Sequence, residues 1–181
     1  IKKDQIVFAF PCQSDQVSSN EFTKFNTIKA KKKLSSAIPL FKTDVSIKNQ
    51  RKDVEIIRDK TKSLILRSKI IIPKRQRLEI SHHKGIENFY KIGMSMIVVV
   101  NFKYCKKLMF LFFNQSHPAQ YHKKKEETFF ILYGKIKISI QNKNKKTVTK
   151  ILKTGDIITI FPGDIHSFKC ISRNGSVIEE L

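Results

Sequence analysis

The fold is decided by the stretch Lys135-Ile-Lys-Ile-Ser-Ile-Gln-Asn-Lys-Asn-Lys-Lys-Thr-Val-Thr-Lys-Ile-Leu152. Isoleucine occupies every second position at its start, and lysine or serine stands between the isoleucines. Because successive side chains of a strand point to opposite faces, this alternation predicts a strand with one buried and one solvated face. Residues 142–144 predict a hairpin turn, and residues 147–152 predict the returning strand. The fold is therefore built outward from an antiparallel hairpin.

Further short strands are predicted on both sides of this hairpin. They are expected over residues 70–72, 77–80, 96–102, 107–113, 157–161, 165–171 and 176–180. Gly155–Asp156 and Pro162–Gly163 supply turns between them. Many short strands separated by turn residues are typical of an antiparallel barrel or sandwich. We therefore expect a mainly β fold, with a β-barrel over residues 70–181.

The N-terminal part has a different pattern. Residues 1–48 alternate short apolar runs with polar stretches, which predicts a small, loop-rich extension with some β structure. Residues 49–69 place Val54, Ile57 and Leu64 among charged residues at spacings near three and four. This spacing predicts an amphipathic helix that links the extension to the barrel, so the extension as a whole is expected to be α+β.

The composition is that of a globular chain with an unusual charge. The 181 residues are 40% hydrophobic and carry a formal net charge of +21. Lysine outnumbers arginine thirty to six, although arginine is the better bidentate partner of phosphates and bases. The lysines are spread along the whole chain, so a solvated lysine-rich surface is the favoured interpretation. Nucleic acid is not expected as the main partner, and a basic, non-catalytic binding protein remains an alternative function.

The cysteines and the hydropathy pattern indicate in which cellular compartment the protein is expected. Cys12, Cys105 and Cys170 are odd in number and widely spaced, which predicts neither a disulfide framework nor a CxxC metal site. The N-terminus lacks the pattern of a secretory signal, and lysines interrupt the most apolar stretch, residues 94–113. We expect a cytoplasmic protein without a membrane partner. Since the chain begins at Ile1, it is also expected to be a piece of a longer protein or a trimmed product.

Four residues form a candidate metal-binding set: Gln120, His122, Glu127 and His166. Residues i and i+2 of a strand share a face, so Gln120 and His122 are expected to reach one ion together. Glu127 and His166 are expected to complete the set from neighbouring strands. Two imidazoles, a carboxylate and an amide oxygen suit a divalent Zn, Mn, Fe, Ni or Co ion with positions left open for water or substrate. A metal-free barrel that keeps these side chains as polar filling is the alternative.

The spacing of these residues resembles the paired motifs of cupins, which are small double-sheet jelly-roll barrels. His122, Glu127 and Gly134 keep H-x4-E-x6-G, and residues 155–166 keep G-x6-P-G-x2-H. The chain departs from the pattern at Gln120, where the usual motif has histidine, and at Cys170, where it has asparagine. Sugar-handling cupins of the mannose-6-phosphate isomerase type carry Q-x-H, so the resemblance implies a sugar or sugar-phosphate ligand.

Four further residues are candidates for contact with that ligand. His117 precedes Pro118 and is expected at the rim of the pocket, and Lys124 belongs to a lysine run that could attract a phosphate or carboxylate. Tyr133 and Phe168 are expected in the pocket wall or in the core. For each of them a purely structural or solvated role is the alternative.

A wider resemblance concerns the C-terminal region of N-acetylneuraminate (sialic-acid) synthase-like proteins, in which a cupin follows the catalytic barrel. The stretches that carry it are residues 78–85, 104–107 and 115–129. In that family an (α/β)8 barrel condenses phosphoenolpyruvate with an amino sugar, and this sequence contains nothing that could form one. The resemblance therefore implies an accessory region of nonulosonic-acid biosynthesis, with a separate synthase barrel as a partner.

The sequence leaves open whether the chain is an enzyme. A sugar-recognising metal-binding module and a stand-alone sugar or sugar-phosphate isomerase or epimerase both fit the candidate site. In the second case a nearby base such as His117 would move a proton. Cupins commonly pair through exposed strands, so the resemblance also implies a homodimer.

Overall fold

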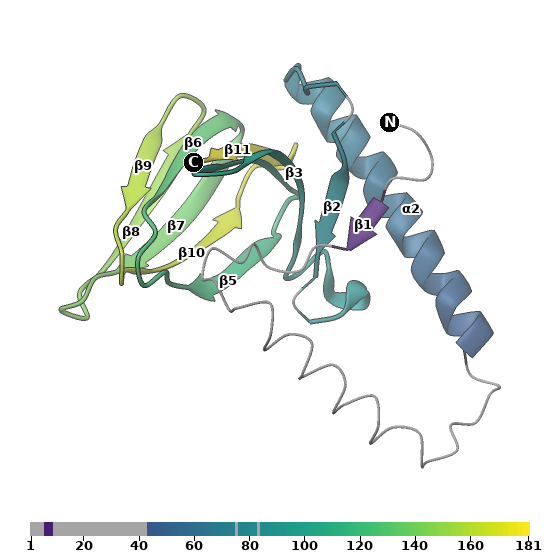
Figure 1. The fold of residues 1–181 in the computed structure, drawn as a ribbon, viewed down its shortest axis with the longest axis horizontal. Helices are drawn as coiled ribbons and strands as arrows, with labels where there is room; N and C mark the ends of the chain where they lie inside the picture. The colour runs from purple at the N-terminus through teal and green to yellow at the C-terminus, as the bar shows by residue number, and fades with distance from the viewer. Residues whose placement is uncertain (1–5, 9–42, 75, 83) are drawn as a thin grey trace, which may run out of the picture.

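The computed structural model describes residues 6–8, 43–74, 76–82 and 84–181. In it two β-sheets pack face to face, and a long helix lies against the outer face of the larger sheet (Figure 1). The larger sheet has the order β1 (Ile6–Phe8), β2 (Leu78–Ser81), β3 (Met94–Asn101), β4 (Cys105–Leu111), β11 (Ser176–Glu180), β6 (Glu127–Tyr133), β9 (Ile157–Ile160). The smaller sheet has the order β5 (Ser116–Gln120), β10 (Ile165–Cys170), β7 (Lys135–Gln141), β8 (Thr147–Lys153). The helices are α2 (Thr43–Ser68) and the 3-10 turn η1 (Ile86–Asn88).

The order of the last eight strands identifies the architecture. Strands β4 to β11 follow the orders β4-β11-β6-β9 and β5-β10-β7-β8 in the two sheets. The chain crosses between the sheets at every connection among them except the β7–β8 hairpin. This is the strand order of a jelly roll, the double-sheet form that cupins share. The predicted mainly β, cupin-like fold is therefore confirmed.

Helix α2 covers the larger sheet with one apolar face. Val54, Ile57 and Leu64 are buried at helical spacing, and Leu64 packs in a cluster with residues of β2, β3, β4 and β11. Thr61 lies on the same face, where its Oγ1 atom is 2.8 Å from Ser95 Oγ in β3. The predicted helix is thus present, but it begins at Thr43 rather than at residue 49.

The structure tests only parts of the predicted extension. Residues 43–48, which were expected in its loops, belong to the helix. Strand β1 pairs in parallel with β2, which joins the start of the chain to the sandwich. The remainder of the predicted extension, residues 1–5 and 9–42, lies outside the described residues.

The space between the sheets holds the main apolar core. Ile136 and Ile138 of β7 are buried in it, as the alternation predicts, whereas Lys135 and Lys137 are exposed. Strand β4 is buried on both faces: Met109 faces this inner core, and Phe110 faces the cluster under α2. Residues at the open end of the inner face are polar, and this is where the candidate site lies.

Two glycines with positive φ give the first test of this packing. Gly134 has φ 82°, and an added Cβ would collide with the Gly175 carbonyl oxygen and lie 2.7 Å from Ser176 Oγ. Gly155 has φ 94° with no atom within 4 Å of an added Cβ. We expect Gly155→Ala to lower the free energy of unfolding by about 1–2 kcal/mol, the cost of the left-handed backbone. Gly134→Ala is expected to cost about 2 kcal/mol more, because the strain of overpacking is added.

Urea denaturation of both variants provides the measurement. Gly155 is the control for backbone strain, because an added Cβ there meets no other atom. The difference in the free energy of unfolding between the two variants therefore measures the close approach of Gly134 to the β10–β11 turn. Equal losses would contradict this packing.

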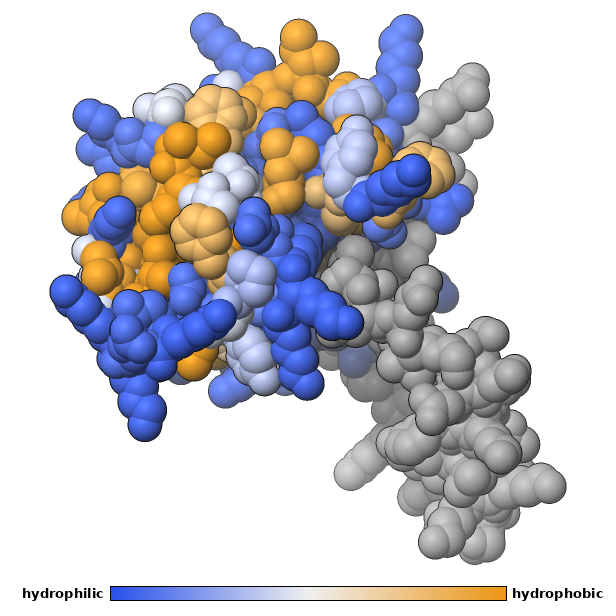
Figure 2. Space-filling view, turned by 60° about the vertical axis from the view of Figure 1, so that its left-hand side comes forward, coloured by the Kyte–Doolittle hydropathy of each residue, from blue (hydrophilic) through white to orange (hydrophobic). Residues whose placement is uncertain are grey.

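The surface on the side of β8 and β9 carries apolar residues between lysines. Figure 2 shows apolar side chains gathered on this face and hydrophilic side chains around them. The exposed apolar residues of these two strands and their flanking turns include Val148, Ile151, Ile157 and Phe161.

The predicted homodimer stays a prediction. Among the described residues, no helix is long and apolar enough to span a membrane.

Candidate metal centre

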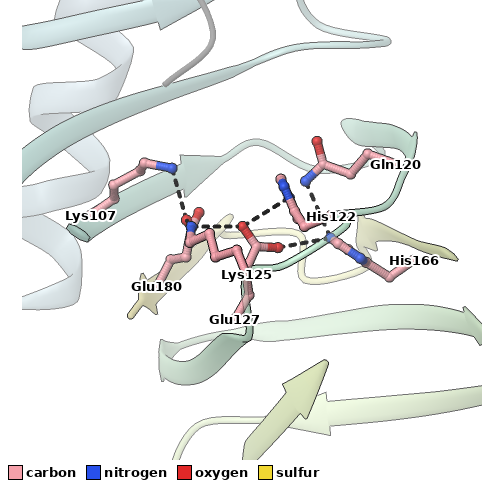
Figure 3. Close-up of polar contacts among 7 residues, drawn as sticks. All are labelled: Lys107, Gln120, His122, Lys125, Glu127, His166 and Glu180. Carbon is pink, nitrogen blue, oxygen red and sulfur yellow. Dashed lines mark hydrogen bonds and ion pairs between the residues drawn. The ribbon is translucent and has the colours of Figure 1, made fainter. Parts of the chain in front are cut away.

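Three side chains converge at the open end of the inner core, and we call them the ligand triad: His122, Glu127 and His166 (Figure 3). His122 Nε2 lies 3.1 Å from Glu127 Oε1, and His166 Nε2 lies 3.2 Å from Glu127 Oε2. One ligand atom from each residue lies within 4.8 Å of the other two. Glu127 and His166 are buried, whereas His122 is partly exposed.

Each triad residue comes from a different part of the jelly roll. Glu127 begins β6 in the larger sheet, and His166 lies in β10 of the smaller sheet, so the two sheets meet at the triad. His122 lies beyond the end of β5, so the prediction that it shares a strand with Gln120 is wrong. A turn holds it instead, because Gly163 N donates a hydrogen bond of 2.8 Å to the His122 carbonyl oxygen.

The Pro162–Gly163 turn therefore positions two triad members. It leads into β10, where His166 follows within a few residues, and its backbone holds His122 in the connection between β5 and β6. Gly163 has φ 89°, a backbone conformation that residues with a side chain rarely adopt. This gives a physical reason for the proline-glycine pair in the sequence motif.

The residues present fit a divalent transition-metal ion. His122 Nε2 and Glu127 Oε2 are buried atoms whose only contacts are the charge contacts of 3.1 and 3.2 Å within the triad, and neither makes a regular hydrogen bond. Buried polar atoms without a partner are costly, so their convergence calls for an explanation. Two imidazoles and one carboxylate are the donors of many zinc, manganese and iron sites. A single ion between the three side chains would satisfy all of them.

Gln120 lies beside the triad but presents nitrogen to it. Its Nε2 atom is 3.2 Å from His166 Nε2, and β5 and β10 pair Gln120 directly with His166. The sequence analysis expects the carbonyl oxygen of Gln120 as a ligand. The observed amide would have to rotate to present that oxygen, so in this arrangement Gln120 contacts His166 as a neighbour.

A line of alternating charges continues from the triad across the larger sheet, and we call it the charge chain: Glu127, Lys125, Glu180 and Lys107 (Figure 3). Lys125 Nζ lies 2.9 Å from Glu127 Oε1 and 2.8 Å from Glu180 Oε1. Lys107 Nζ lies 2.8 Å from the same oxygen of Glu180. The charge chain gives Glu127 a cationic neighbour at Oε1, the same carboxylate oxygen that His122 approaches.

The charge chain sets the protonation of its members. Burial alone would raise the pKa of Glu127, but His166 and the Lys125 ammonium outweigh burial and lower this pKa to about 2. Burial likewise opposes the charge of Lys107, yet the Glu180 carboxylate raises the pKa of Lys107. Glu127 is therefore an anion at neutral pH, which is the form that binds a metal.

Sequence analysis missed most of the charge chain. Lys125 belongs to the same lysine run as Lys124, which the sequence places either near an anionic ligand or in solvent, and the sequence predicts no role for Lys107 and Glu180. The strand pattern holds a signal for the last two. They lie two residues from the buried apolar residues Met109 and Ile178 on the same strands, which places them on the inner face.

The four predicted ligand-contacting residues lie in different places. His117 is buried on the inner face, where its ring stacks on Phe168 with centroids 5.0 Å apart. Phe168 belongs to the inner core and contacts Phe129, which in turn contacts His166. Lys124 is exposed. Tyr133 packs with the cluster under α2, because a register shift between β11 and β6 interrupts the alternation, and it lies at the opposite end of β6 from Glu127 of the triad.

Comparison with known proteins gives likeness in structure alone. No family model matches the chain, and no curated protein matches it. The resemblance to sialic-acid synthase-like proteins therefore stays a prediction.

Several cupin structures are similar to this chain. The cupin domain of Drosophila melanogaster CENP-C has a TM-score of 0.47 and 19% identity, over 49% of this chain and 68% of that one. Bacillus subtilis oxalate decarboxylase has a TM-score of 0.45 and 18% identity, over 49% and 24% of the two chains. KdgF from Halomonas sp. has a TM-score of 0.42 and 10% identity, over 48% and 77%. The cupin-like fold of this chain is assigned from its own strand order, and the chemistry of its site from its own residues.

Proposed function

We propose that this chain is a cupin-like domain that binds one divalent metal ion at the ligand triad and uses it to hold a sugar-like ligand. The observation that carries the proposal is the convergence of three buried or half-buried donors, two of whose atoms have no hydrogen bond. A bound divalent ion would polarise a hydroxyl or carbonyl oxygen and lower the pKa of a bound water. The histidines and Glu127 would hold the ion, and Lys125 would keep Glu127 ionised.

The proposed ligand is a sugar acid of the nonulosonic type. The resemblance of the Q-x-H motif to sugar-handling cupins supports a hydroxylated ligand. The resemblance to sialic-acid synthase-like proteins supports an acid, whereas Lys125 does not bear on it, because its ammonium is already paired with Glu127 and Glu180. The described residues contain no (α/β)8 barrel, so the condensation reaction of a synthase is not proposed for this domain.

One observation favours a second candidate, a metal-dependent isomerase or epimerase. His117 is a second buried imidazole on the inner face, on the strand that pairs with the strand of His166. An imidazole can take up and release a proton near neutral pH, as these reactions require. Screening amino sugars and their phosphates for isomerisation by the metal-loaded protein would distinguish this enzyme from a binding module.

Metal titration tests the proposal directly. Protein treated with a chelator and then titrated calorimetrically with Mn²⁺, Zn²⁺ or Ni²⁺ is expected to bind one ion per chain. The bound ion is expected to raise the unfolding temperature, because it binds the folded state alone. N-acetylneuraminate is then expected to bind to the metal-loaded protein and not to the metal-free protein.

The two parts of the proposal can fail separately. A chain that binds no ion at the triad would overturn the metal site. Binding of N-acetylneuraminate that is equal with and without metal would overturn only the role of the metal in holding the ligand.

A further inference from the structure

A second cavity lies on the opposite face of the larger sheet, between helix α2 and the turn that precedes β11. Its volume is about 500 Å³, within the range of small-ligand sites. Its lining combines three cations with three aromatic rings: Lys60, Arg67, Arg173, Tyr90, Phe112 and Phe113. No carboxylate lines it. The ligand triad is on the inner face of the same sheet, so the two sites are distinct.

The cations of this cavity have no anionic partner within the described chain. None of the ion pairs among the described residues includes Lys60, Arg67 or Arg173. The acid nearest in sequence, Asp59, pairs with Arg58 at 2.8 Å and approaches Lys62 at 3.7 Å. Three positive charges around one cavity repel one another, and an anion bound between them would remove that repulsion.

The walls of the cavity are held in place before any ligand binds. Arg67 Nη1 donates a hydrogen bond of 3.1 Å to the Asn174 carbonyl oxygen, which joins the helix to the turn. Gly175 packs closely in the same turn, where an added Cβ would lie 2.9 Å from the Leu111 carbonyl oxygen. Such a turn cannot shift without disturbing β4, so the cavity is preformed.

The aromatic wall indicates the second part of the ligand. The rings of Tyr90 and Phe112 lie 5.7 Å apart, and Lys60 Nζ lies 4.3 Å above the Tyr90 ring. Phe113 is 46% exposed and so offers its ring to solvent at the cavity. Large exposed rings are well placed to stack on a planar group, as aromatic side chains do with nucleobases.

We propose that the cavity between α2 and the β10–β11 turn binds a small anion that carries an aromatic ring, with the chemistry of a nucleoside phosphate. Arg67 and Arg173 hold the phosphate, since arginine offers paired N–H groups in the geometry of phosphate oxygens. Phe113 stacks on the ring. The site binds a mononucleotide rather than a polymer, because its cations surround one cavity and do not follow a groove.

Calorimetric titration of the whole chain at physiological ionic strength tests the site, with AMP, adenosine and inorganic phosphate as probes. AMP is expected to bind at least about tenfold more tightly than either adenosine or phosphate, since each part of the site contributes separately. Arg173→Gln is expected to weaken AMP binding about tenfold and Phe113→Ala by a similar factor. Both residues are exposed, so both variants are expected to keep the wild-type unfolding temperature.

Lys150→Gln is the matched control for charge. Lys150 is an exposed residue of β8, at the edge of the other sheet, and its loss changes the net charge by the same amount. AMP binding is expected to be unchanged in this variant. Equal weakening in Arg173→Gln and Lys150→Gln would overturn the site in favour of a general effect of the +21 charge. Binding that is detectable only with oligonucleotides would also overturn it.

Discussion

Replacement of His166 with alanine is expected to weaken the binding of the divalent ion by more than about 100-fold, since loss of even an outer-shell partner typically costs 10–100-fold. His166 is fully buried, lies 3.2 Å from Glu127 Oε2 and comes from the opposite sheet to Glu127. Solvent therefore cannot easily replace its ring as a ligand. Competition for Zn²⁺ with a chromophoric chelator measures the affinity of the variant.

His117→Ala is the matched control for this experiment. Both histidines are buried and lie on the paired strands β5 and β10, so their removal leaves cavities of similar size. The His117 variant is expected to keep the metal affinity within about threefold, because His117 lies outside the triad. If His166→Ala retained the affinity of the wild type, the ion would have to bind elsewhere on the chain, and the proposed function would lose its basis.

Glu180→Gln is expected to lower the free energy of unfolding by about 3 kcal/mol, the scale seen when one partner of a buried ion pair is removed. Glu180 Oε1 accepts hydrogen bonds from both Lys107 and Lys125. The side chains of Glu180 and Lys107 are only 6% and 11% exposed. The amide would leave two half-buried ammonium groups around a neutral side chain. Urea denaturation at neutral pH gives the measurement.

The neighbouring residue supplies the control for that loss. Glu179 pairs with Lys106 at 3.0 Å on the outer face of the same strands, where both partners are more exposed. Glu179→Gln is expected to cost less than about 1 kcal/mol, as is usual for surface ion pairs. Similar losses in the two variants would show that the charge chain stabilises the fold no more than a surface pair does.

Local pattern predicted a mainly β barrel or sandwich, and the jelly-roll form was predicted from the resemblance of the motifs to cupins. The short strand expected over residues 70–72 is wrong, because those residues form no regular secondary structure. The alternation at Ile136 and Ile138 determines the buried face of β7, and turn residues mark the strand ends, because both depend on neighbours in sequence. The helix was predicted from the spacing of Val54, Ile57 and Leu64, but not its start at Thr43. A helix predicted from the spacing of apolar residues begins near the first residue of that pattern. The turn before it carries little apolar periodicity in the sequence, so the prediction did not include it.

The candidate site could be predicted in part. The spacing of His122, Glu127 and His166 identifies them as a set, and the structure brings their ligand atoms together. The strand pattern places Lys107 and Glu180 on the inner face, but the pairing in the charge chain could not be predicted, because Lys125 and Glu180 are 55 residues apart and meet only once β6 pairs with β11. Long-range pairing of this kind leaves no local periodicity. The turn that holds His122 depends in the same way on Gly163, 41 positions later along the chain.

The edges of the two sheets suggest a role for some of the exposed lysines. Among the described residues, β8 and β9 each pair on one side only, and Ile151 and Ile157 leave apolar surface beside these edges. An unpaired edge is a template on which another chain can add a strand, and edge lysines oppose this by bringing like charges together. Lys150 and Lys153 are exposed on β8, where they would be forced against their counterparts in such a pair. The lysines of β8 thus oppose the uncontrolled addition of strands from other chains, a role that requires no bound ligand.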